Sequence, residues 1–330
     1  MKIKVEILTG IRPTSDLTVG NYLGAIEPII KLQHQWHAPL IFIADLHALT
    51  DNEPTVVKKY SNKIVADCIA LGIDPEKTKF FLQSALAGEI SILMAFLARH
   101  ISVAELLRVP TLKEKIRDKA NPETANVFLF LYPVMMAADI LLQRAKKVPL
   151  GEDQLAHLEL SRKLARRFNK RYGEVFPVPE ALRTKALRIL SLKGEGKMSK
   201  SMPEGAIFLT DDLKTVARKI KGAETAVEGV MNKKLESHIL IAKSLSKTKT
   251  EREEIDALMV EHKAGKPVMV QFKHVFTRIV QNFLVEFQLK KAKVVRDSSF
   301  IPSVLEEGIK IARVNARETL ELIKQALYHF

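Results

Sequence analysis

The stretch LTGIRPTSDLTVGNYLGA, residues 8–25, connects a strand-like segment to a helix that starts around Val19. Alternating apolar residues before it predict a strand over residues 3–8, and apolar residues spaced three or four apart after it predict one buried helix face. Glycine at a helix start lets a phosphate group approach the backbone, where unpaired N–H groups favour anions. Taken alone, the stretch also fits an ordinary connection between a strand and a helix.

Working outward, short β-branched or aromatic runs alternate with longer helical patterns as far as about residue 210. This alternation is typical of a parallel sheet flanked by helices. The expected strands cover residues 3–8, 40–44, 79–82, 148–150 and 187–190. The expected helices cover residues 22–34, 55–71, 128–142 and 152–168. We therefore predict an α/β fold with a Rossmann-like, doubly wound parallel sheet.

Beyond residue 210 the strand patterns nearly vanish, and helical patterns rich in Lys and Glu run to residue 330. The expected helices there cover residues 211–220, 233–243, 251–262, 268–287 and 303–327. We expect two domains, a Rossmann-type domain over residues 1–210 and a mostly helical C-terminal domain over residues 211–330.

The charge balance favours a polyanionic partner, because 52 Lys and Arg against 38 Asp and Glu leave a net charge of +14 over 330 residues. The single cysteine, Cys68, excludes a disulfide within the chain, and its apolar surroundings predict a small core residue. The N-terminal residues lack an apolar signal core, and the longest apolar stretch, residues 127–142, is interrupted by Pro133 and Asp139. These features predict a cytoplasmic protein with no membrane partner.

A second informative segment is GKMSKSMP, residues 196–203. Its two lysines, set among serines and a glycine, form a cationic loop that can meet negative charge developing on a polyphosphate leaving group. An ordinary solvated basic loop is the alternative. The five consecutive residues KMSKS are nevertheless far more specific than the glycine-containing stretch.

Together the two segments resemble the paired signatures of class I aminoacyl-tRNA synthetases, with residues 18–21 in the place of the HIGH box and residues 197–201 as the KMSKS loop. Both histidines of HIGH are replaced, by Thr18 and Asn21, which is similar to the version in the tryptophanyl-tRNA synthetase family. The likeness to that family extends through TGIRPT, GNYLGAI, IADLHALT, GIDP, YPVMMAADILL, PLGEDQLAHLELSR and RFNKRYGEVF.

This resemblance implies ATP-dependent activation of L-tryptophan, transfer to tRNA(Trp), ATP and Mg²⁺ as cofactors, and a homodimer without a protein-held metal. It assigns catalytic roles to Lys197, Lys200, Thr18 and Asn21. The implied ATP site comprises Arg12, Pro13, Thr14, Gly20, Asn21, Gly151, Glu152, Asp153, Ile189, Lys197, Met198, Ser199, Lys200 and Ser201. The implied tryptophan site comprises Asp139, Met136, Gln154 and His47. The helical domain is expected to bind the anticodon end of the tRNA.

Asp139 has a physical reason of its own, because a carboxylate in an apolar helix is costly unless it has a partner. At the end of a dry pocket it can accept an indole N–H, and Met136 on the same helix face offers a polarizable wall. The alternatives are that Met136 is ordinary core and that Asp139 pairs with Arg144 or a nearby lysine.

Two departures from the family pattern concern Ser15, where glycine is usual, and Leu8, where an aromatic residue is frequent. A third is Arg12, a cation where some relatives carry glutamine and others arginine. Ser15 predicts changed backbone angles before the HIGH-like box. The rival functions are a tyrosyl-tRNA synthetase, which Met136 argues against because that family tends to have glutamine there, and a catalytically silent RNA-binding paralogue.

Overall fold

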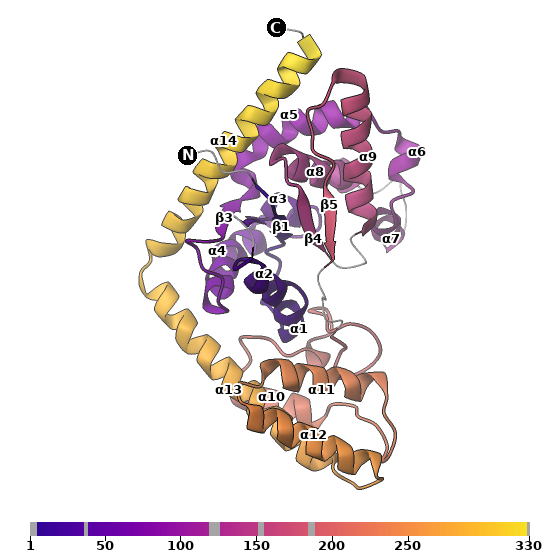
Figure 1. The fold of residues 1–330 in the computed structure, drawn as a ribbon, viewed down its shortest axis with the longest axis vertical. Helices are drawn as coiled ribbons and strands as arrows, with labels where there is room; N and C mark the ends of the chain where they lie inside the picture. The colour runs from indigo at the N-terminus through magenta and orange to yellow at the C-terminus, as the bar shows by residue number, and fades with distance from the viewer. Residues whose placement is uncertain (1–4, 36–38, 119–125, 151–154, 184–188, 329–330) are drawn as a thin grey trace.

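A computed structural model describes residues 5–35, 39–118, 126–150, 155–183 and 189–328 of the chain. Figure 1 shows two lobes, a sheet lobe that contains every labelled strand and a helical lobe below it. The strands are β1 Leu8–Ile11, β2 Leu40–Ile43, β3 Lys79–Leu82, β4 Lys147–Leu150 and β5 Glu180–Arg183.

Helices of the sheet lobe surround these strands. They are α1 Val19–Asn21, the π-helical turn η1 Tyr22–Ile26, α2 Glu27–Leu32, α3 Asp45–Ala48, α4 Pro54–Ala70, the 3-10 turn η2 Gln83–Leu86, α5 Ala87–Ala98, α6 Val103–Leu106, α7 Pro110–Asp118, α8 Val127–Leu142 and α9 Leu155–Tyr172. A 3-10 turn, η5 Pro203–Gly205, precedes the helical lobe. That lobe comprises α10 Leu213–Lys221, α11 Lys233–Leu245, α12 Lys249–Lys263 and α13 Met269–Arg296, and the chain ends in α14 Phe300–Tyr328.

All strand pairs in the two sheets are parallel, as the sequence predicts. β1, β2 and β3 lie in that order, and β4 pairs with β5. A parallel bridge between Ile7 and Lys147 places β4 beside the entry to β1, so the order across both sheets is β3-β2-β1-β4-β5. This order confirms the Rossmann-like fold. It also places a topological switch point between β1 and β4, where open α/β sheets bind their ligands.

Local signals explain where two of the predicted helices of this lobe begin or end. α4 begins at Pro54, whose fixed φ suits the first helical turn, and it ends before Gly72, which has a φ of +118°. α8 begins where the Asn126 side chain accepts a hydrogen bond from the Leu129 N–H at 2.7 Å. Cys68 is buried in α4 as expected, and burial raises the pKa of its thiol. Within the described residues, no helix is long and apolar enough to cross a membrane.

Three strand predictions need correction. The first strand begins at Leu8 instead of ending there, because Ile7 makes only a single bridge and the ladder to β2 starts one residue later. Of the strand expected at residues 187–190, the described part forms only an isolated bridge from Leu190 to Lys197. β5 was missed, because its sequence EALR favours a helix and becomes a strand only by pairing with β4.

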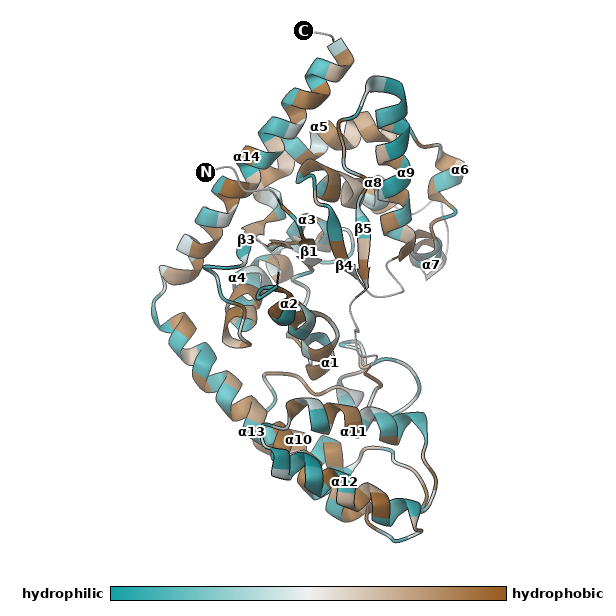
Figure 2. Ribbon diagram, viewed as in Figure 1, coloured by the Kyte–Doolittle hydropathy of each residue, from teal (hydrophilic) through white to brown (hydrophobic). Residues whose placement is uncertain are grey.

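The C-terminal helix returns to the sheet lobe after the long diagonal of α13 (Figure 1). It packs against β3, and a Cβ atom added at Gly308 would lie 1.8 Å from the carbonyl oxygen of Phe80. The hydropathy of α14 agrees with this packing, because apolar and polar residues alternate along the helix (Figure 2). On the other side of the lobe, α9 presents a polar outer side (Figure 2). The division at residue 210 stays a prediction, and residues 300–328 contact the sheet lobe.

The close approach at Gly308 yields a test of this packing. Gly308→Ala should lower the free energy of unfolding by about 1–3 kcal/mol, because the added methyl group forces α14 away from the β3 backbone. Gly88→Ala is the matched control, since no atom lies within 4 Å of its added Cβ. That control should be neutral or stabilising by roughly 0.5–1 kcal/mol. Equal urea midpoints for the two variants would contradict the packing of α14 on β3.

Candidate active site

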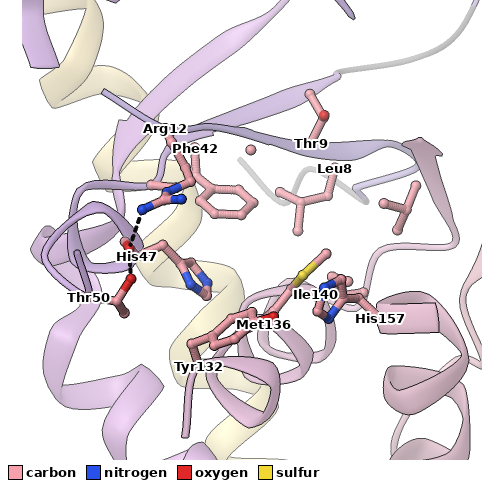
Figure 3. A pocket seen from close by; sticks show the side chains of 13 residues that line it. Leu8, Thr9, Arg12, Phe42, His47, Thr50, Tyr132, Met136, Ile140 and His157 are labelled. Atoms are coloured by element: carbon pink, nitrogen blue, oxygen red, sulfur yellow. Dashed lines mark hydrogen bonds between the residues drawn. The ribbon is translucent and has the colours of Figure 1, made fainter. Parts of the chain in front are cut away.

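A cavity of about 340 Å³ opens at the switch point between β1 and β4 (Figure 3). Its walls come from the carboxyl ends of β1 and β2, from β4, and from helices α8 and α9. The lining residues are Leu8, Thr9, Gly10, Arg12, Phe42, Ala44, His47, Thr50, Tyr132, Met136, Ile140, Val148 and His157. This volume lies in the range of small-molecule sites.

Gly10 allows the Phe42 ring to form one wall of the cavity. A Cβ atom at residue 10 would lie 2.4 Å from the tip of that ring, so a side chain there would displace it. On the opposite wall, Tyr132, Met136 and Ile140 follow one another at helical spacing along α8, and Figure 3 shows them facing the cavity. The cavity is therefore mainly apolar and aromatic.

Asp139 lies one helical turn after Met136, is 5% exposed and is not among the residues that line the cavity. His47 Nε2 lies 2.9 Å from its Oδ2 atom, and Gln83 Nε2 donates to both carboxylate oxygens at 2.9 and 2.8 Å. The alternative pairing with Arg144 or a nearby lysine is wrong, because His47 and Gln83 are the partners and Arg144 is exposed in the turn after α8. An imidazole and an amide side chain, and no Lys or Arg among the described residues, hold this carboxylate.

Burial raises the pKa of Asp139, and the hydrogen bonds from His47 and Gln83 oppose that rise. The negative charge of Asp45 adds to it. His47 is fixed from several sides, since its backbone N–H donates to Gln83 Oε1 at 3.1 Å and its carbonyl accepts from the Thr50 hydroxyl at 2.8 Å. Arg12 also donates to that carbonyl, at 3.2 Å (Figure 3). The cavity thus has a rigid polar corner.

The HIGH-like box forms a capped helix start beside this corner. The Asn21 N–H donates to Thr18 Oγ1 at 3.1 Å, and the Thr18 N–H donates to Asn21 Oδ1 at 3.0 Å. This reciprocal capping box satisfies two backbone donors at the helix start. The π-helical turn η1 follows at once, and such turns occur frequently at functional sites.

The KMSKS loop packs directly on that helix start. A Cβ atom at Gly20 would lie 3.2 Å from Met198 Cβ, so glycine permits the contact. The chain after the loop adds two backbone hydrogen bonds to the box, from the Val19 N–H to the Ile207 carbonyl and from the Leu209 N–H to the Leu17 carbonyl, each 2.9 Å. Two segments almost 180 residues apart therefore form one surface.

Lys200 is turned toward the loop before the box, where its Nζ atom donates to the Ser15 carbonyl oxygen at 3.2 Å. Burial lowers the pKa of Lys200 to about 8; the nearby cations Arg12 and Lys63 add to this, and the carboxylates of Asp16 and Asp67 oppose it. A partly dehydrated ammonium group interacts more strongly with an anion than a fully solvated one does. Lys200 is therefore the described KMSKS lysine that is best prepared to meet phosphate.

The other residues predicted for the ATP site differ in their exposure and in their hydrogen-bond partners. Pro13 is buried, Thr14 is half-buried, and the guanidinium of Arg12 pairs with Asp51. Ile189 is 4% exposed in the core, so only its backbone is available to a ligand. Lys197 is exposed, and Ser199 and Ser201 hydrogen-bond each other at 2.7 Å. Gly151, Glu152, Asp153 and Gln154 lie outside the described residues.

The departures from the family pattern at Ser15 and Leu8 have clear structural settings. Ser15 does not have a positive φ, so the backbone at this position does not require glycine. Leu8 is fully buried and forms part of the cavity wall. Neither substitution distorts the described site.

Several residues of this site were not predicted from the sequence, among them Gln83, Phe42, Tyr132 and His157. Gln83 had a usable signal, because a polar residue directly after a buried parallel strand lies at the edge where ligands bind. The other three look like ordinary aromatic or amphipathic core positions. Only the packing of α8 and α9 against the strands brings them together.

Comparisons with known proteins agree with this geometry. Residues 2–293 match the family model described as tRNA synthetases class I (W and Y). The tryptophan–tRNA ligase of Treponema pallidum is 34% identical over 98% of this chain and 96% of its own. The Campylobacter jejuni tryptophanyl-tRNA synthetase complexed with ADP and tryptophan has a TM-score of 0.83 at 31% identity, covering 97% of this chain and 99% of that chain. The Mycoplasma pneumoniae synthetase has a TM-score of 0.85 at 32% identity, covering 99% and 97%.

The polar corner behind the cavity can be tested through Gln83. Gln83→Leu should lower the free energy of unfolding by about 2–4 kcal/mol at neutral pH, because it removes a donor from Asp139 and an acceptor from the His47 N–H. Thermal or urea unfolding measures the loss.

The cost should be smaller at pH 4 than at pH 8. Because the folded-state pKa of Asp139 is raised, the stability that this carboxyl contributes is present at low pH and is lost as the pH rises through that pKa. The Gln83 donor stabilises the ionised form, so its loss costs more at the higher pH. Gln33→Leu is the control, because Gln33 bonds only neutral groups, including the Gly72 carbonyl at 3.0 Å and the Asp74 N–H at 2.9 Å. A pH-independent cost for Gln83→Leu would show that it does not stabilise an ionised carboxylate.

Proposed function

Because the chain belongs to the class I tRNA synthetases of the tryptophan and tyrosine group, we propose that it is a tryptophan–tRNA ligase. It activates L-tryptophan with ATP to the adenylate and then transfers the amino acid to tRNA(Trp). The observation that carries this proposal is the contact of the KMSKS loop with the Thr18–Asn21 helix start, next to an aromatic-lined cavity. A polyphosphate and an aromatic amino acid then meet at one edge of the sheet.

In the activation step, the tryptophan carboxylate attacks the α-phosphate of ATP in line, and pyrophosphate leaves. The helix start at Gly20 and the side chain of Asn21 bind phosphate, and the buried Thr18 positions Asn21 through the capping box. Lys200 with Lys197 neutralises charge that develops on the pyrophosphate. No protein nucleophile takes part. Positioning and electrostatic stabilisation supply the acceleration.

We assign the indole ring to the cavity beside Met136 and His47. Asp139 accepts the indole N–H, since an ionised carboxylate has about four acceptor positions and the donors from His47 and Gln83 leave one for a ligand. Met136 contributes a polarizable wall one helical turn away. Gln154 completes the proposed pocket, although it lies outside the described residues.

Mg²⁺ enters this proposal as a companion of ATP. Within the described residues, no three His, Cys, Asp or Glu side chains gather in a way that could hold a metal ion. Mg²⁺ is usually bound by substrate phosphates and water, so ATP carries it into the proposed site.

The helical lobe is the proposed site for the anticodon end of the tRNA, consistent with the net charge of +14 and with its many Lys side chains. We also propose a homodimer. Exposed apolar side chains on α5, α6 and α8 of the sheet lobe, namely Ile92, Val103 and Val127, are the candidates for its interface. The compartment proposed for the ligase is the cytoplasm, where tRNA is charged.

Amino-acid-dependent exchange of pyrophosphate into ATP tests the proposed function. The wild type should exchange faster with tryptophan than with tyrosine, because a cavity wide enough for indole leaves a phenol ring poorly packed. Faster exchange with tyrosine would identify a tyrosyl enzyme, and no exchange with either would leave a silent paralogue.

The same assay tests Asp139. Asp139→Ala should lower kcat/KM for tryptophan by about 10- to 150-fold, because a hydrogen bond to a charged acceptor contributes roughly 1.5–3 kcal/mol. The KM for ATP should change little, and rejection of phenylalanine should weaken, since phenylalanine no longer strands a buried carboxylate. Asp139→Asn keeps an acceptor oxygen and should lose less. Normal tryptophan kinetics in Asp139→Ala would remove this residue from the site.

Lys200 has its own pH signature. The ammonium form is present below a pKa of about 8, so kcat/KM for ATP should fall as the pH rises through that value. Lys200→Ala should lower the activation rate by about 100-fold at pH 7 and abolish this alkaline decline, while tryptophan affinity stays the same. An alkaline decline that persists in Lys200→Ala would assign the titration to another group.

A further inference from the structure

One face of α13 connects the helical lobe to the sheet lobe. Phe283, Phe287 and Lys291 are spaced four residues apart and therefore share that face. The Phe283 ring stacks on Tyr22 with centroids 5.0 Å apart, directly after the HIGH-like box, and Phe287 is buried. Lys291 pairs with Asp67 of α4, against which α13 packs.

Asp67 is an unusual anchor, because it is a charged residue that is only 1% exposed in the last turn of α4. A buried carboxylate requires compensating charge. Asp67 receives it from both lobes, since Lys63 of its own helix lies 3.3 Å away and Lys291 of α13 pairs with its other oxygen. This carboxylate therefore ties the two lobes together at one point.

Lys63 continues the chain of charges toward the nucleotide site. Its Nζ atom also pairs with Asp16, in the loop that connects β1 to the HIGH-like box. The adjacent residue, Ser15, supplies the carbonyl oxygen that holds Lys200. Four charged side chains thus run without interruption from α13 to the residue on which the KMSKS lysine docks.

We propose that Lys63, Asp67 and Lys291 are positioning residues for Lys200, which act by fixing the Ser15–Asp16 segment relative to α13. The position of the helical lobe then determines where Lys200 lies when ATP is activated. This inference rests on the proposed function, because it assigns Lys200 to the activation step. It adds a chain of ion pairs through which binding of a ligand to the helical lobe affects the nucleotide site.

The charged groups that face Lys200 come from two elements. Arg12 and Asp16 belong to the loop after β1, and Lys63 and Asp67 belong to α4. Removing the Lys63 cation should raise the pKa of Lys200, and removing the Asp67 charge should lower it. Loss of Lys63 and loss of Asp67 thus shift the pKa of Lys200 in opposite directions, although either loss releases the Ser15–Asp16 segment.

The kinetic test uses Lys63→Met, Asp67→Asn and Lys291→Met in the full chain. Each should lower kcat/KM for ATP in tryptophan-dependent exchange by about 5- to 20-fold, with the KM for tryptophan unchanged. The Asp67→Asn/Lys291→Met double variant should lose less than the product of the single losses, because both changes break one contact. Thermal unfolding identifies any variant that fails to fold, and Lys63→Met, the change at the most exposed of the three side chains, then carries the test.

The pH profile separates positioning from a merely structural role. The alkaline decline of kcat/KM for ATP should move up by about half a pH unit in Lys63→Met and down by a similar amount in Asp67→Asn. Glu307→Gln is the matched control, because Glu307 of α14 also pairs across elements, with Lys79 of β3 at 2.8 Å, but lies outside this network. It should leave both kcat/KM and the pH profile unchanged.

Folded variants with kcat/KM for ATP within twofold of the wild type would overturn the proposal, as would shifts of the same sign in Lys63→Met and Asp67→Asn. Equal losses in Glu307→Gln would show a general effect of lobe packing and would also overturn it. The wild-type assay distinguishes this failure from failure of the proposed function. If tyrosine alone supports exchange, the tryptophan assignment fails and the network is tested with tyrosine; if neither supports it, equilibrium binding of ATP to the same variants gives the answer.

Discussion

The backbone contact between residues 17–19 and residues 207–209 is the constraint on which the proposed nucleotide site depends. Hydrogen bonds in both directions clamp the helix start of the HIGH-like box to the chain that leaves the KMSKS loop. Because Gly20 has no side chain, Met198 can then pack against the helix start. Without this clamp, the cationic loop would be one more solvated segment, and the phosphate-binding helix start would face no lysine.

Two buried carboxylates serve this site in different ways. Asp139 is held by the side chains of His47 and Gln83, and burial raises its pKa although both partners oppose that rise. Asp67 is held by two lysines from different lobes, so its charge is balanced. The first arrangement suits recognition of a ligand donor at the cavity. The second suits mechanical connection, because it is stable only while both partners stay in place.

The C-terminal part of the chain contributes to both lobes. α10 to α13 form the helical lobe, whereas α14 packs against β3 through the close approach at Gly308. Two C-terminal helices thus contact the sheet lobe. α13 packs against α4, and α14 packs against β3. Such an arrangement restricts hinge motion between the lobes and gives small displacements of α13 a direct effect on the loop at Asp16.

Sequence alone determined the alternation of strands and helices, the parallel sheet, both signature segments and the buried acid at Asp139, because each depends on local periodicity or on a short, specific motif. It did not determine β5, whose residues favour a helix, or the partners of Asp139, which lie 92 and 56 positions away in the sequence. The chain of charges from Lys291 to Asp16 was equally hidden, since lysines and acids on helices normally face solvent. Tertiary structure decided these features because hydrogen bonds and ion pairs between distant segments depend on which helix faces pack together. The spacing of apolar residues in the sequence shows only which face each helix buries, not which helix or strand covers that face.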